Sequence, residues 1–300
     1  MNQLIPRFSY MRFLRQAFVS AALLASIAVT GCQSIHGSRN ACDQAPFCQS
    51  ACDSMAVGCD ASCDLGSGTS GNVQLVRGRK VALLDGLGSV LGSVNKLALW
   101  DRRADNHNIS PQTEEAVVQY LRENGLGSTL VRSNQYDPIG EWHRLASNKR
   151  MAAPLRYTFG TYDWLKYTVL PGRLTGGDWY NPYSDTVHLY SDIPTIGLAK
   201  AAYAKDVYSR SGPASYAALQ DLPLIGLYHE TIANREVLQF TRSHGGSAAV
   251  TEAERILYPD LAGSIGAQTL GIFPYGSVVG RGAGALVGHT ALAVKDRVVR

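Results

Sequence analysis

The sequence predicts an α+β fold in which a small, mainly antiparallel sheet packs against helices. Residues 186–191 alternate as a half-buried strand does, and residues 177–180 lead into them through the turn-prone residues 181–185. This pattern indicates a hairpin. Capped helical segments lie before and after it, and elements grouped in this way are typical of the α+β class.

Length and composition fit one globular domain with additions, since the 300 residues are 45% hydrophobic and 17% charged. The formal charge of +4 depends on Arg7, Arg12 and Arg15, which lie in a segment that we expect to be removed. Without them, basic and acidic residues nearly balance. The chain has no basic stripe and no recognised nucleic-acid module, so we expect no nucleic-acid partner.

Residues 1–31 have the order of a signal peptide: basic residues, an apolar run over 17–29, then small residues. Their end, Val29-Thr30-Gly31-Cys32, resembles a bacterial lipobox, although two positions differ from the common Leu-Ala-Gly-Cys form. The resemblance implies acylation of Cys32 and a lipid anchor in the cell envelope. Gln33 after it implies the outer membrane if the cell has one. An uncleaved membrane anchor is the alternative.

Residues 32–72 read as a tether with a cysteine cluster and the flexible linker 66–71. Exported chains favour disulfides, and a small hairpin would allow Cys52 to pair with Cys59 and Cys48 with Cys63. A metal site and free thiols are the alternatives. Cys42 is left over, either free or bridging two molecules.

The folded part is predicted over residues 73–258. Residues 80–92 are apolar with three glycines, and their pattern does not decide between a strand and a helix. Ser110-Pro111 begins a helix that ends at Gly125, a strand follows at 129–133, and Asp137-Pro138 begins the next helix. The aromatic residues of 155–174 either line a groove or, as we expect, belong to the core.

Two helices follow the hairpin. The first starts at Asp192 and Pro194 and places Ile196, Ala199, Tyr203 and Val207 on one face. The second is predicted from Asp221 to Gly245-Gly246, and its apolar stripe includes Glu230 between the small residues Gly226 and Ala233. Because an unpaired inward carboxylate is costly, we expect Glu230 to have a partner.

Residues 229–234 (HETIAN) resemble the second active-site helix of gluzincin-type zinc metallopeptidases, in which the Glu is the third zinc ligand. In that family the first helix carries H-E-x-x-H, whose two His side chains share one face and bind zinc while the Glu acts as base. The matching positions here are Ala199, Lys200 and Tyr203. The resemblance therefore implies a degenerate metal site at Ala199, Lys200, Tyr203 and Glu230.

We expect no metal, no cofactor and no catalytic residue in such a site, because Ala199 has no donor atom and protonated Lys200 is no base. Lys200 or the Tyr203 hydroxyl would instead pair with Glu230. His188 projects with Thr186 and Tyr190 from one strand face, either as a groove residue or, as we expect, as a surface or satisfied histidine. No other catalytic motif occurs.

The C-terminal segment, residues 259–300, contains glycine at every fourth position from Gly276 to Gly288, which lets another helix approach closely. With the apolar run 261–273 before it, the segment resembles the glycine-zipper hairpins of some envelope lipoproteins. The alternatives are membrane association and packing onto the core. Arg281 interrupts the apolar character of the second part.

These features predict a membrane-anchored envelope lipoprotein with an inactive metallopeptidase-like domain that has a binding or scaffolding role and a protein or peptide partner. One alternative is an active zinc hydrolase with an unrecognised ligand set that includes Glu230. The other is a purely structural envelope protein.

Overall fold

The computed structural model describes residues 73–298 except 170, 171, 176, 223, 224 and 272. The signal peptide, the acylation of Cys32 and the cysteine pairings were predicted for residues 1–72 and lie outside the described residues. The same holds for Cys42.

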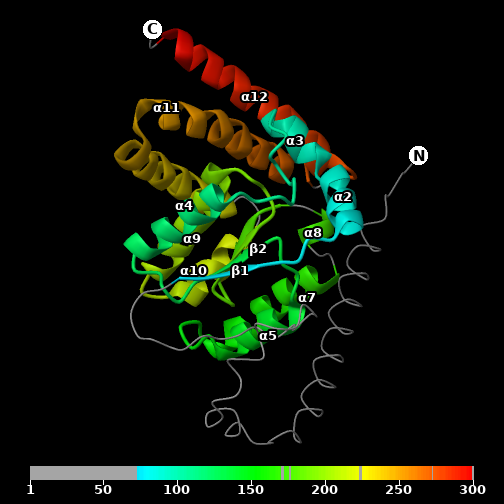
Figure 1. Ribbon diagram of the computed structural model, residues 1–300, viewed down its shortest axis with the longest axis vertical. Helices are drawn as coiled ribbons and strands as arrows, with labels where there is room; N and C mark the ends of the chain where they lie inside the picture. Colours follow the sequence, from blue (N-terminus) through cyan, green and yellow to red (C-terminus); the bar gives the residue numbers. More distant parts are fainter. Residues whose placement is uncertain (1–72, 170–171, 176, 223–224, 272, 299–300) are drawn as a thin grey trace, which may run out of the picture. The chain divides into compact units, whose positions relative to one another are not determined.

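A four-stranded sheet in the order β1-β2-β4-β3 lies at the centre of the described region (Figure 1). The strands are β1 (Gln74–Arg77), β2 (Leu130–Ser133), β3 (Trp179–Asn181) and β4 (Thr186–Leu189). The predicted hairpin is confirmed, because β3 and β4 pair antiparallel with Tyr180 opposite Val187. It puts β3 at one edge of the sheet and β1 at the other.

The helices make up most of the remaining described chain. They are α2 (Ala82–Leu91), α3 (Ser93–Leu99), α4 (Pro111–Glu123), α5 (Pro138–Ser147), α6 (Ala153–Leu155), α7 (Thr161–Val169), α8 (Gly172–Thr175), α9 (Pro194–Tyr208), α10 (Pro213–Gln220), α11 (Gly226–Leu270) and α12 (Gly276–Val298), with one π-helical turn at Arg156–Gly160. The α+β class is therefore confirmed, and residues 82–91 of the segment left open are helical.

The strand order corrects the predicted sheet, which we expected to be mainly antiparallel. β1 with β2 and β2 with β4 are parallel pairs, so only the β3–β4 pair is antiparallel among the described strands. Parallel neighbours need long crossovers, and residues 78–129 and 134–185 supply them with helices. The sequence concealed this because β1 is short, mostly exposed and without alternation.

The two faces of the sheet are covered by different helices. Figure 1 shows α4 and α9 on one side and α5 and α7 on the other. Val131, Val187 and Leu189 are fully buried in the main core, to which α4 and α9 contribute most of their apolar residues. Their neighbours Arg132 and His188 point to the opposite face, as the two-residue period of a strand requires.

A buried polar cluster joins that second face to α5. Glu141 accepts hydrogen bonds from the Ser184 hydroxyl and from Asn181 Nδ2 at 3.1 Å, and it lies 3.3 Å from both His188 Nε2 and Arg132 Nε. Burial opposes ionisation of Glu141, but its interactions with His188, Ser184 and Arg132 outweigh burial and lower its pKa to about 2. His188 is thus a fully buried core histidine and not a groove or surface residue: its Nε2 faces Glu141, while its Nδ1 has no hydrogen-bond partner among the described residues.

The second of the two helices after the hairpin begins later than predicted. Asp221 is the C-terminal cap of α10, and α11 starts at Gly226. A break in α11 does occur where Gly245-Gly246 predicted an end, since Gly246 has φ +69° and ψ −169°. A helix then resumes and continues past residue 258, the predicted boundary between the folded part and the C-terminal segment.

The second part of α11 and α12 form an antiparallel helical pair, with α3 against both (Figure 1). Gly280, Gly284 and Gly288 of α12 lie at the helix–helix contact: a Cβ on Gly280 would come 2.1 Å from the Gly266 carbonyl oxygen, and one on Gly284 2.0 Å from that of Ala262. Among the described helices, none is both long enough and apolar enough to cross a bilayer.

Candidate functional site

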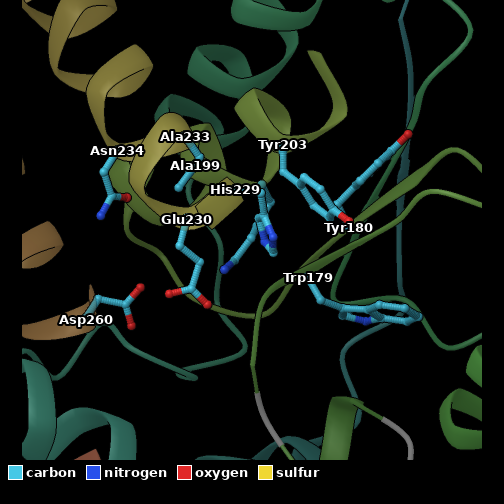
Figure 2. Close-up of a pocket in the computed structure, with 10 residues that line it drawn as sticks. Trp179, Tyr180, Ala199, Tyr203, His229, Glu230, Ala233, Asn234 and Asp260 are labelled. Atoms are coloured by element: carbon cyan, nitrogen blue, oxygen red, sulfur yellow. The ribbon is translucent and has the colours of Figure 1, made fainter. Parts of the chain in front are cut away.

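The four positions of the degenerate site meet at one pocket of about 150 Å³ between β3, α9 and α11. Ala199, Lys200 and Tyr203 come from α9, where residues four apart share a face. Glu230 comes from the first part of α11. Figure 2 shows its carboxylate directed into the pocket, with Asp260 of the second part of α11 turned toward it.

Local sequence explains how α9 and α11 present these side chains. α9 begins at Pro194, and the carboxylate of Asp192 just before it accepts hydrogen bonds from Ser110 and Thr113 of the α4 start. α11 packs on α9 through Ala233 and Val237, which are fully buried. The inward stripe that the sequence predicted for this helix is therefore present.

Aromatic rings line the side of the pocket nearest β3. Tyr203 stacks on His229 with ring centroids 3.9 Å apart, and Tyr180 meets Tyr203 edge-on at 5.6 Å. Burial, followed by the charge of Lys200, lowers the pKa of His229 to about 3. His229 is therefore a neutral imidazole at pH 7, and its ring covers one face of the Tyr203 ring.

Glu230 has a mixed environment. Burial raises its pKa, Lys200 lowers it, Asp260 raises it, and a hydrogen bond from Ser264 lowers it, with a net rise. Among the ion pairs within 4 Å in the described part of the chain, none joins Glu230 to Lys200 or to any other cation. The direct pair that we expected is not formed, and Lys200 acts on Glu230 from farther away.

A second cavity of about 290 Å³ adjoins the first, because Lys200 and Asp260 line both. Its wall includes Asp105 and Asp178. Asp178 accepts hydrogen bonds from the backbone N–H of Tyr190 at 2.6 Å and of the next residue at 3.1 Å. Burial and the charge of Asp105 nevertheless raise the pKa of Asp178 to about 6.

Asp260 and Arg281 join this second cavity to the C-terminal helices. They form an ion pair of 2.8 Å, and the Arg281 Nε donates to Asn95 Oδ1 at 2.6 Å. Asp260, Arg281 and Asn95 all line the second cavity, so both contacts of Arg281 lie in its wall. The residue that interrupts the apolar character of α12 thus has a partner on α11 and another on α3.

The side chains at the pocket do not fit a zinc ion. Tetrahedral zinc sites need three or four N, S or carboxylate ligands. The methyl group of Ala199 offers none, and Lys200 brings a cation to the same wall. Within the described residues, no three His, Cys, Asp or Glu side chains are arranged to hold a metal. We therefore derive no metal chemistry for this site.

Sequence reasoning missed the acidic and basic residues that complete the site: Asp105, Asp178, Asp260 and Arg281. The charges of Asp260 and Arg281 inside apolar stretches were the available signal. Asp105 has φ +44° and lies in no pattern that the sequence marks, and Asp178 was assigned only to the segment that leads into the hairpin.

No known family, curated protein or solved structure matches this chain.

Proposed function

We propose that this chain is a cell-envelope protein, anchored by a lipid at Cys32, whose folded part binds a protein or peptide segment without hydrolysing it. The observation that carries the proposal is the meeting of Ala199, Lys200, Tyr203 and Glu230 at one pocket. The helix pair and the carboxylate resemble a gluzincin site, whereas the other three positions lack its ligands and its base.

The neighbouring strand supports binding of an extended segment. β3 is an edge strand of the sheet, and its residues Trp179 and Tyr180 line the pocket. Tyr180 and Asn181 are buried, so Trp179 is the β3 residue that such a segment would reach, through its aromatic side chain. Lys200 and Glu230 then offer opposite charges to the side chains or termini of such a segment.

The absence of a zinc site is tested with residues 73–300, which exclude the cysteines. After zinc loading and dialysis, we expect no bound zinc in the wild type and none in Glu230→Ala. Ala199→His, Lys200→Glu and Tyr203→His together should create a site for one zinc, because they restore the family's ligands and base.

The matched control adds Glu230→Gln to the triple variant and should abolish its zinc binding. One zinc in the wild type that is lost in Glu230→Ala would contradict the proposal and indicate an active hydrolase. A triple variant that binds no zinc would contradict the gluzincin resemblance.

Binding is measured with a randomised peptide pool passed over the immobilised chain. The wild type should retain a subset of peptides uncleaved. Lys200→Gln should retain at least about threefold less, since each charge-assisted hydrogen bond contributes on the order of 1–3 kcal/mol. Lys205→Gln is the control, because Lys205 lies on the same helix but pairs with Glu236.

A further inference from the structure

Exposed apolar side chains are concentrated on three helices of the described region. Most of the large apolar residues that face solvent lie in or next to α2, α3 and α12. Single exposed apolar residues are normal, but a concentration of them indicates an interaction surface.

α2 is the clearest case. Leu83, Leu87 and Val90 follow the spacing of one helix face and are 75%, 50% and 69% exposed. The other face holds α2 to the body of the domain: a Cβ on Gly88 would come 2.2 Å from the Arg173 carbonyl oxygen. The apolar face of α2 is therefore fixed in an outward orientation.

α3 and α12 continue this surface. α3 packs against α12, and Trp100, directly after α3, stacks on His289 of α12 with centroids 3.8 Å apart. Trp100 and Leu97 are themselves exposed, as are Val279, Val287 and others along α12. Figure 1 shows α2, α3 and α12 next to one another. We call this set of three helices with Trp100 the apolar surface.

The charges on the apolar surface are mainly positive. Asp85 is the one acidic residue in the sequences of α2 and α3, and it pairs with Arg173 at 2.7 Å. Lys80 precedes α2 and Lys96 lies in α3. The last turn of α12 holds Lys295, which pairs with Glu254 of α11, and Arg297, with the acidic Asp296 between them. Apolar helix faces flanked by basic residues bind the interface of bilayers with anionic lipids.

The position of these helices in the chain favours a bilayer as the occupant. The described region begins at Val73, roughly 40 residues after Cys32, and α2 begins nine residues later. An anchor at Cys32 would keep the apolar surface close to the membrane and make its contact intramolecular. A second copy of the chain would instead bring basic residues of the same surface together, which is unfavourable.

We propose that α2, α3 and α12 dock on the anionic surface of a lipid bilayer. The choice of occupant rests on the anchor in the proposed function, but the test does not use the anchor. It uses residues 33–300, which contain every described residue and lack both the signal peptide and Cys32. Failure of docking would leave acylation of Cys32 as an independent question.

The probe is vesicles of phosphatidylcholine with phosphatidylglycerol, and binding is read by co-flotation. The wild type should float with these vesicles and much less with phosphatidylcholine alone. Leu83→Glu with Leu87→Glu should reduce the bound fraction at least about tenfold, since two apolar side chains are replaced by charges.

The matched control is Ile139→Glu with Leu219→Glu. These residues are 72% and 51% exposed, close to the values of the test pair, and lie on α5 and α10. The control should bind vesicles as the wild type does. Thermal unfolding of both variants shows whether each is folded.

Three outcomes would overturn the proposal. In the first, the wild type does not float. In the second, the test and control variants lose binding equally, which places the contact elsewhere. In the third, no form of the chain binds vesicles, and sedimentation shows a wild-type dimer that dissociates in the variant with Leu83→Glu and Leu87→Glu. This result would mean that a second copy of the chain covers the apolar surface.

Discussion

Two aspartates next to the hairpin have opposite pKa shifts. The pKa of Asp178 is raised, because burial and the charge of Asp105 outweigh its two backbone hydrogen bonds. The pKa of Asp192 is lowered, because hydrogen bonds from Ser110 and Thr113 and the charge of Arg103 outweigh its burial. Burial and the negative charge of Asp105 decide the direction at Asp178, whereas the positive charge of Arg103 adds to the hydrogen bonds that lower the pKa of Asp192.

The shift of Asp178 predicts that Asp178→Asn is stabilising at high pH. Between about pH 4 and pH 6 the folded chain binds this proton more tightly than the unfolded chain, so stability falls as pH rises through that window. The amide keeps an oxygen that accepts both backbone hydrogen bonds. We expect a gain on the order of 2 kcal/mol in the free energy of unfolding at pH 8 and little gain at pH 4.

Urea unfolding at both pH values measures this difference. Asp192→Asn is the control of opposite sign: its carboxylate stabilises the fold above the ordinary Asp pKa, and this contribution is lost as pH falls through its lowered pKa. It should therefore destabilise at pH 8. A loss of stability for Asp178→Asn at pH 8 would show that the charged carboxylate is favoured after all.

For single residues, the sequence predicted which way a side chain points better than it predicted the groups around that side chain. The inward position of Glu230 followed from helical period alone, and the structure confirms it. The neighbours of Glu230 could not be predicted in this way, because Asp260 and Ser264 belong to a later part of α11 that only the tertiary fold brings near. The stacking of Tyr203 on His229 could not be predicted from the sequence either.

The close contact of α11 with α12 depends on positions without a side chain. Gly284→Ala would place a Cβ 2.0 Å from the Ala262 carbonyl oxygen, so the two backbones must separate. We expect a loss of about 1–3 kcal/mol in the free energy of unfolding, read by thermal or urea unfolding.

Gly282→Ala is the matched control on the same helix, because nothing lies within 4 Å of its Cβ. It should be neutral or stabilising by up to about 1 kcal/mol, since alanine favours helix. Equal effects of the two substitutions would mean that helix propensity, and not the contact with α11, decides stability here.

Elements with local signals could be predicted from the sequence. Ser110 accepts a hydrogen bond from the Thr113 N–H, and Asp137 from the Gly140 N–H, as the expected caps do. The start of α11 was missed because the cap signal of Asp221 belongs to the end of α10. The direction of strand pairing was missed because it depends on contacts across many residues, which no local pattern contains.

For the whole molecule, the proposed anchor predicts that Cys32 carries the lipid. Labelled palmitate should enter the wild type and fail to enter Cys32→Ser, whereas Cys42→Ser should be labelled as the wild type is. Several acyl chains contribute about 0.8 kcal/mol per buried methylene, enough for stable retention in the membrane fraction. Mass spectrometry should find Cys32 as the acylated N-terminal residue.

Label retained in Cys32→Ser would place acylation on another cysteine. An unlabelled wild type that stays in the membrane fraction would indicate the uncleaved anchor, with residues 17–29 holding the chain.

The sheet order has a mechanical consequence for a chain held in this way. β1 is the first described strand after the segment that leads from Cys32, and it pairs with a neighbour on one side only. Tension between the anchor and a bound partner would therefore load the β1–β2 backbone hydrogen bonds before any other part of the sheet. β3 and the pocket lie at the opposite edge, so the first strand to yield under tension would be the one farthest across the sheet from the proposed binding site.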